Sequence, residues 1–251
     1  MYLCVPMRPL KRWRYVGAYG PDVMACMGDV RIGALRQRFW AVCEPGRPVV
    51  ERTTLGRGGV SMDGPRASVS AGDVRIELVV EESAGVETRH ADGVWTRKLA
   101  GVPVRGAISV HGRAYELDCL GAVDETRGRH RRHTTWTWSA GGGRDTDGRR
   151  VGWNLVSGVN DEPAGSERCL WVDGSPREVG PVSFADDLSS VAFTEGGSLS
   201  FDEWDAREDH TNLLILRSDY RQPFGTFSGA LPGGVELAEG YGVMEWHDVR
   251  W

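Results

Sequence analysis

Short runs of alternating apolar and polar residues, each ended by a turn that contains glycine or proline, dominate this sequence. Residues 74–80 (VRIELVV) alternate in this way, and residues 107–110 (AISV) are closed by His111 and Gly112. The 34 glycines and 12 prolines in 251 residues are too many for a mainly helical protein, but they suit a chain with many tight turns. Helical periodicity is weak, and its best example, residues 201–210, has few apolar positions. The sequence therefore predicts an all-β protein with very little helix.

Two hairpins are predicted most clearly. One joins residues 134–138 to residues 151–156 through a polar loop that contains Asp147 and Gly148. The other begins at residues 169–172 and turns at Asp173 and Gly174, a dipeptide typical of two-residue turns. Further strands are expected at 93–98, 115–117, 198–201 and 213–218. A single continuous barrel of this length is less usual than two smaller ones, so we expect two antiparallel barrel-like or sandwich-like halves packed together, residues 1–122 and 123–251.

The charge and composition exclude several kinds of partner and site. The formal net charge is −5 and the pI is near 5.7, which gives no general reason to bind nucleic acid or an anionic membrane. No apolar run approaches the roughly 20 residues of a membrane span, and no signal peptide is recognised, so we expect a cytoplasmic protein. The five cysteines are scattered and match no metal or redox motif. Residues 141–148 complete neither a phosphate loop nor a calcium loop, so no metal and no cofactor are expected.

Aromatic residues gather in the second half of the chain. Trp136 and Trp138 share one face of the predicted strand, and Trp153 lies on its predicted partner. Three tryptophans this close either fill a core or line a cavity for an apolar ligand, and the pattern leaves both alternatives open. Asn154 is an amide inside an apolar strand and must find partners, because an unpaired buried amide costs roughly 1–3 kcal/mol. Asn160 lies in the loop that follows.

Three carboxylates are candidates for acid chemistry. Asp124 and Glu125 lie next to a basic stretch, residues 127–133, in which side chains such as Arg127 can fix the carboxylates in place. His133 ends that stretch. In the last predicted strand, residues 240–251, Glu245 and His247 project from the same face. If that face is inward, Glu245 is a buried acid with a raised pKa; if it is outward, the two form an ordinary surface pair.

Several segments resemble a known bacterial family. These are residues 121–128 (GAVDETRG), 136–141 (WTWSAG), 153–155 (WNL), 223–229 (PFGTFSG) and the ending at 242–245 and 250–251, with a looser match at 11–13. They resemble a family labelled as a domain of unknown function, the one numbered 2804, which looks like a distant relative of carotenoid 1,2-hydratases and lipocalin-like proteins. The resemblance implies two lipocalin-like β halves and, for several relatives, protonation, hydration or cyclisation of polyene and isoprenoid substrates.

One motif of those hydratases departs here. The hydratase pattern of Asp, three residues and Gly falls on Asp124 and Gly128, but Arg127 replaces the aromatic residue that usually precedes the glycine. A guanidinium beside Asp124 would hold it ionised and weaken it as a proton donor.

Together these observations predict a cavity for a hydrophobic small molecule, isoprenoid, polyene or polyketide-like, that is hydrated, cyclised or isomerised by acid catalysis. The alternative is a non-catalytic carrier or stress-related lipid-binding protein, so whether the chain is an enzyme stays open, as does the choice between monomer and homodimer. The candidate catalytic group consists of Asp124, Glu125, Arg127, His133 and Glu245. The candidate ligand-binding group consists of Trp136, Trp138, Trp153, Asn154, Asn160, Phe224 and His247.

Overall fold

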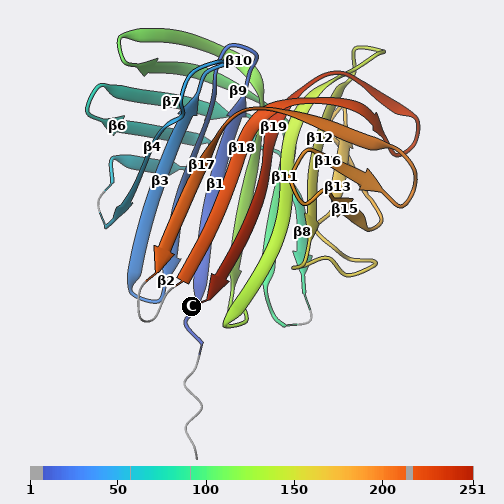
Figure 1. Cartoon of the computed structure of the whole chain (residues 1–251), viewed down its shortest axis with the longest axis horizontal. Helices are drawn as coiled ribbons and strands as arrows, with labels where there is room; N and C mark the ends of the chain where they lie inside the picture. Colours follow the sequence, from blue (N-terminus) through green and yellow to red (C-terminus); the bar gives the residue numbers. More distant parts are fainter. Residues whose placement is uncertain (1–7, 57, 91, 213–216, 251) are drawn as a thin grey trace, which may run out of the picture.

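Two curled antiparallel sheets with the same strand order make up the protein (Figure 1). The computed structural model describes residues 8–56, 58–90, 92–212 and 217–250. The first sheet has the order β4-β3-β2-β1-β10-β9-β7-β6-β5, with β8 also paired to β9, and the second has the order β14-β13-β12-β11-β19-β18-β17-β16-β15. In each sheet the first strand pairs with the last one of its half, β1 with β10 and β11 with β19. The two halves therefore repeat one up-and-down, lipocalin-like arrangement.

The strands of the first sheet are β1 (Lys11–Tyr19), β2 (Met24–Ile32), β3 (Leu35–Cys43), β4 (Val50–Leu55), β5 (Val60–Asp63), β6 (Arg66–Ala71), β7 (Val74–Val80), β8 (Val86–Arg89), β9 (Trp95–Val110) and β10 (Arg113–Gly128). Those of the second sheet are β11 (His133–Asp145), β12 (Arg150–Ser157), β13 (Cys169–Val172), β14 (Ser175–Glu178), β15 (Val182–Phe184), β16 (Ser190–Phe193), β17 (Ser198–Asn212), β18 (Arg217–Leu231) and β19 (Val235–Arg250).

The all-β prediction is confirmed. None of the described residues is helical, and the weak helical candidate at 201–210 lies inside β17. Both predicted hairpins are present as β11–β12 and β13–β14. Asp173 and Gly174 both have positive φ, 48° and 80°, as a two-residue primed turn requires. The strand expected at 213–218 falls partly on residues 213–216, outside the described residues. No helix that is long and apolar enough to cross a membrane is found in the part of the chain that is described.

The change from one sheet to the other lies between Gly128 and His133. The boundary expected at 122/123 falls within β10, a strand of 16 residues that belongs wholly to the first sheet. The boundary between the two sheets therefore lies a few residues after the boundary that the change in composition predicts.

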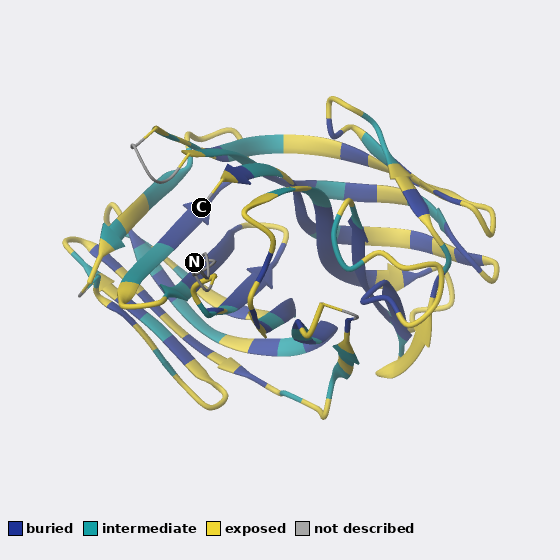
Figure 2. Ribbon diagram, turned by 90° about the horizontal axis from the view of Figure 1, so that it is seen from below, coloured by how far each residue is buried: buried dark blue, intermediate teal, exposed yellow. Residues whose placement is uncertain are grey.

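Three apolar clusters hold the structure together. Buried and exposed residues alternate along many strands (Figure 2), so that each sheet presents one apolar face to its own concave side. The opposite faces of the central strands form a third cluster between the two halves. In β1, for example, Val16 and Ala18 belong to the core of the first half, whereas Tyr15 and Tyr19 belong to the cluster between the halves. Because each concave face is filled by its own core, the space between the halves is the place left for a ligand.

Backbone approaches backbone where the halves meet. A Cβ on Gly152 of β12 would lie 2.3 Å from the carbonyl carbon of Ala100 in β9, and Gly101, with φ of 66°, would clash with Gly152 in turn. We expect Gly152→Ala to destabilise the protein by about 1–3 kcal/mol, because neither backbone can move without disturbing a sheet. Thermal unfolding measures this loss, with Gly148→Asn in an exposed positive-φ turn as the control. An unchanged Gly152→Ala protein would show that the halves are loosely packed here.

Candidate functional site

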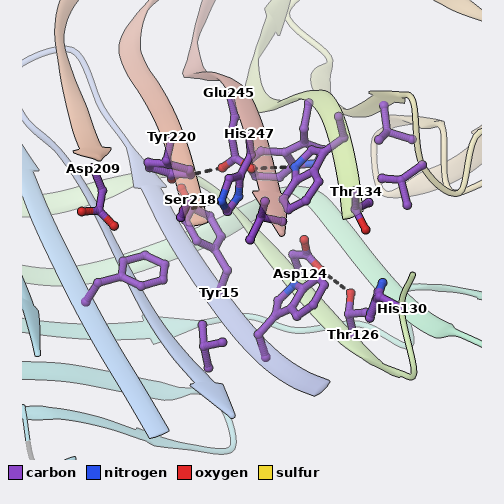
Figure 3. A pocket seen from close by; sticks show the side chains of 18 of the residues that line it. Tyr15, Asp124, Thr126, His130, Thr134, Asp209, Ser218, Tyr220, Glu245 and His247 are labelled. Carbon is purple, nitrogen blue, oxygen red and sulfur yellow. Dashed lines mark hydrogen bonds between the residues drawn. The ribbon is translucent and has the colours of Figure 1, made fainter. Parts of the chain in front are cut away.

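A cavity of about 190 Å³ lies at the junction of the two halves (Figure 3). For comparison, a cavity of about 150 Å³ is enough to bind benzene. Strands β1–β4, β9 and β10 of the first sheet and β11, β12 and β17–β19 of the second contribute to its walls. Most of the wall surface is apolar, although more than half of the lining residues carry a polar group. Their aromatic members are Trp13, Tyr15, Phe39, Trp136, Trp138 and Tyr220.

Three neighbouring strands place a row of rings on the cavity wall. His247 of β19 pairs with Tyr220 of β18 on one side and with Trp136 of β11 on the other. Directly opposed side chains on one face of a sheet are in contact, and here the ring centroids lie 5.0 Å and 4.4 Å from that of His247. Ser218 Oγ lies 2.8 Å from His247 Nε2. Burial lowers the pKa of His247 to about 3, so its imidazole is neutral and acts as a spacer between the two larger rings.

Three hydrogen-bond donors, two of them from this row, reach Glu245, which lies two residues before His247 on β19. Trp136 Nε1 donates to Oε1 over 2.8 Å. The Tyr220 hydroxyl and Gln222 Nε2 both donate to Oε2, over 3.1 and 2.9 Å. Glu245 is 9% exposed and faces the cavity. Of the two alternatives left open by the sequence, an inward and an outward face, the inward one is therefore correct. Burial raises the pKa of Glu245 to about 7, although the Trp136 and Tyr220 donors act in the opposite direction.

The raised pKa of Glu245 has a measurable consequence for stability. Between pH 4.5 and 7 the folded state holds a proton that the unfolded state has lost, so stability falls as the pH rises through this range. Above pH 7 both states are ionised and the full cost of burying the charge applies. From pH 5 to pH 8 we expect Glu245→Gln to gain up to about 3 kcal/mol in unfolding free energy relative to the parent protein. Denaturant unfolding at both pH values tests this, and a difference that is constant with pH contradicts it.

Further along the cavity wall lies a buried group of one ammonium and two carboxyls. Lys98 Nζ lies 2.8 Å from Asp124 Oδ1 and 3.3 Å from Glu167 Oε2. Burial by itself lowers the pKa of Lys98, but the two carboxyls outweigh it and hold that pKa above its ordinary value. Burial raises the pKa of Glu167, and Lys98 offsets this only in part. The contact of Lys98 with Asp124 is the shorter of the two, so these two residues form the main ion pair of the group.

Comparison with known proteins places the chain in a family. A family model described as a domain of unknown function (DUF2804) matches residues 72–251. The chain belongs to this family. The resemblance seen in the sequence is thereby confirmed. No curated protein sequence matches the chain.

Several solved structures share the fold of this DUF2804 protein. A protein of Nitrosomonas europaea described as a candidate AttH has a TM-score of 0.63 and 12% identity, with 98% of this chain and 96% of that chain covered. Kievitone hydratase of Nectria haematococca has a TM-score of 0.58 and 9% identity, covering 98% and 92%. CghA, solved with Sch210972, has a TM-score of 0.55 and 9% identity, covering 97% and 88%. At such identities the likeness shows the shared fold alone.

The candidate catalytic residues of this DUF2804 chain fall into two groups. Glu245 and Asp124 line the cavity. Glu125 lies on the other face of β10, where Arg14 and Arg97 hold it and keep its pKa below its ordinary value against the effect of burial. Arg127 is exposed and also lies on that other face, so the cation beside Asp124 is Lys98. His133 is exposed and pairs with Asp248 over 2.9 Å.

The candidate ligand-binding residues also divide. Trp136, Trp138, Asn160 and His247 line the cavity. The others contribute to the surrounding structure. Trp153 is fully buried in the core of the second half and donates to Ser139 Oγ over 3.1 Å; Asn154 accepts from Trp138 Nε1 over 2.9 Å and donates to the Glu167 carbonyl; Phe224 is fully buried in the cluster between the halves. Asn154 thus has the partners that its buried position demands, and it fixes the Trp138 ring from behind.

Several other polar residues of the cavity were not identified as site residues from the sequence. Tyr220, Lys98, Glu167, Arg207 and His130 reach it from strands and loops that are distant in the chain. Arg207 is 4% exposed and donates to Glu51 over 2.8 Å and to the Tyr220 hydroxyl over 3.3 Å. Lys98 ended a predicted strand, whereas Arg207 fell in the weak helical candidate at 201–210, and only strand pairing shows that both side chains face inward. Among the described residues no group of three or more His, Cys, Asp or Glu side chains is placed to hold a metal ion.

Proposed function

We propose that the protein binds an apolar small molecule, isoprenoid, polyene or polyketide-like, between its two halves and transforms it by general acid catalysis from Glu245. One observation carries this proposal: a buried carboxyl with a pKa near 7 faces an aromatic cavity. An acid whose pKa lies near the working pH is suited to both giving and taking a proton. In the part of the chain that is described, Glu245 forms no ion pair that would hold it permanently ionised.

The hydrogen bonds of Glu245 indicate where its proton lies. Oε2 accepts two hydrogen bonds and Oε1 accepts one, from Trp136. Each carboxyl oxygen can accept two hydrogen bonds. Oε1 therefore has one acceptor direction free, and it is the oxygen suited to carry the proton. Burial keeps the pKa of Tyr220 well above its ordinary value, so its hydroxyl remains a donor to Oε2 throughout. The three donors stabilise the carboxylate that proton transfer leaves behind.

The proposed step balances without a cofactor. The O–H bond of Glu245 breaks as its proton forms a C–H bond with one carbon of a double bond, and the other carbon becomes a cation. Water then adds and loses a proton to the carboxylate (hydration), a second double bond attacks and the new cation loses a proton from a neighbouring carbon to the carboxylate (cyclisation), or a carbon next to the first cation returns a proton to Glu245 (isomerisation). The faces of Trp136, Trp138 and Tyr15 are placed on the cavity wall to stabilise the cation.

The similar structures support this chemistry by their names. One is a hydratase named for kievitone, and another was solved with Sch210972. A non-catalytic carrier is the alternative function. The ion pair between Asp124 and Lys98 favours it, because a carrier needs no free acid in its cavity. Glu245 is the residue that separates the two functions.

The experiment that tests the proposal follows protons onto carbon. The full chain is incubated in D₂O with a polyene, isoprenoid alcohols and a bacterial lipid extract, and the products are analysed by mass spectrometry and NMR. We expect a product with deuterium bound to carbon, with a gain of water if the reaction is hydration. Recovery of tightly bound but unlabelled molecules would instead establish a carrier, and the absence of any bound molecule would contradict both functions.

A further inference from the structure

The side chain of His130, which lines the cavity, is buried and only partly hydrogen-bonded among the described residues. His130 lies in the loop between β10 and β11 and is 6% exposed. Its ring stacks on Trp13, with centroids 5.0 Å apart and planes 27° apart. Its Nε2 atom is buried and has no hydrogen-bond partner among the described residues. Since buried polar atoms in folded proteins are almost always satisfied, such an atom at the edge of a cavity points to a polar group that the cavity takes in.

The surroundings of His130 make this part of the cavity polar. Thr126 also lines it and donates to Asp124 Oδ1 over 3.2 Å. Asp124 in turn is paired with Lys98, and Lys98 with Glu167. Figure 3 shows His130, Thr126 and Asp124 together, on the side of the cavity away from Tyr220 and Glu245. The polar groups around His130 therefore lie on a different side of the cavity from those around Glu245.

The polar side of the cavity at His130 favours an uncharged group. The ammonium of Lys98 already faces two carboxyls, so it is not available to an anionic group of a ligand. Burial, with a further contribution from the charge of Lys11, lowers the pKa of His130 to about 4, which keeps its imidazole neutral. A neutral imidazole nitrogen accepts a hydrogen bond from a hydroxyl or donates one to a carbonyl, according to its tautomer.

We propose that His130 Nε2 is the hydrogen-bonding group of a subsite that holds one uncharged oxygen, a hydroxyl or a ketone, of an otherwise apolar substrate. This inference rests on the proposed function in one respect: the subsite fixes which carbon of the substrate reaches Glu245. It narrows the substrate class to molecules with an apolar skeleton and an oxygen function at one end. Hydrocarbons without oxygen and carboxylic acids are the two classes that it excludes.

Matched probes of one skeleton test the subsite. Farnesol, farnesene and farnesoic acid share fifteen carbons of the same chain and differ in the end group; geraniol and myrcene form a shorter pair. Binding to the full chain is measured by calorimetry. We expect the alcohols to bind about tenfold more tightly than the hydrocarbons, the difference made by one hydrogen bond to a buried group. Farnesoic acid should bind more weakly than farnesol.

Variants show whether His130 is the group responsible. His130→Phe keeps a ring to stack on Trp13 and should remove the preference for the alcohols, with hydrocarbon affinity unchanged. His130→Gln should restore part of the preference. Glu245→Gln is the matched control and should keep it. If His130→Phe does not fold, ¹⁵N NMR of the parent protein decides, because farnesol but not farnesene should shift the resonance of His130 Nε2.

Each failure has a distinct meaning. Equal binding of farnesol and farnesene, or an unshifted Nε2 resonance, would overturn the His130 subsite and leave acid catalysis by Glu245 standing. Tighter binding of farnesoic acid would overturn the uncharged character of the subsite. No binding by any probe would overturn both the subsite and the proposed function.

Discussion

Replacing Glu245 with glutamine is expected to lower turnover by about 10²–10⁴-fold, the range typical of a lost general acid. The amide has nearly the same shape as the carboxyl and still accepts hydrogen bonds from Tyr220 and Gln222, but it has no proton to give to carbon. Ligand affinity should therefore change little. Deuterium incorporation into product measures turnover, and calorimetry with the same ligand measures affinity.

Glu125→Gln is the matched control for this substitution. Glu125 is a half-buried carboxyl of the central strands, and it lies outside the cavity and is held by Arg14 and Arg97. The turnover of the Glu125→Gln protein should equal that of the parent protein. Equal turnover of the Glu245→Gln protein would transfer the acid role to another carboxyl of the cavity, and Asp124 would be the first to test.

The strands and hairpins were predictable because their signals are local. Alternation needs only neighbouring residues, and turns such as Asp173-Gly174 identify themselves by residue type. The same local rule shows that Glu245 and His247 share a face, but it does not show which way the face points. That depends on pairing between β19 and β11, strands about 100 residues apart in the chain.

Two candidates show where local patterns give incomplete information. Trp153 lies in β12, whose central residues are all buried, since one face of this strand meets its own core and the other meets the first half. A strand buried on both faces has no alternation from which to read direction. Asp124 and Arg127 are three residues apart, and an odd spacing in a strand puts them on opposite faces. The cation that meets Asp124 is its cross-strand neighbour Lys98, in register with it on β9.

The ion pair between Lys98 and Asp124 leads to the second prediction, a large loss of stability. Replacing Lys98 with methionine is expected to destabilise the protein by about 3–5 kcal/mol, because it leaves a buried carboxylate without its cation. Lys98 is 3% exposed and the Asp124 side chain 14%, so little water can take the place of the ammonium. For a chain of this size the loss corresponds to a decrease in Tm of roughly 10 °C. Differential scanning calorimetry at neutral pH measures it.

Removing the charge of Asp124 as well should recover part of this loss. In the Lys98→Met/Asp124→Asn protein no unpaired carboxylate remains at position 124, so its Tm should lie between those of the parent and the single variant. The loss in the single variant should also shrink at acidic pH, because a protonated carboxyl no longer needs a cation. A Lys98→Met protein with the Tm of the parent at neutral pH would mean that both carboxyls are already neutral there. The cavity would then hold two further acids able to protonate a substrate, and Glu245 would lose its distinction as the free acid of the site.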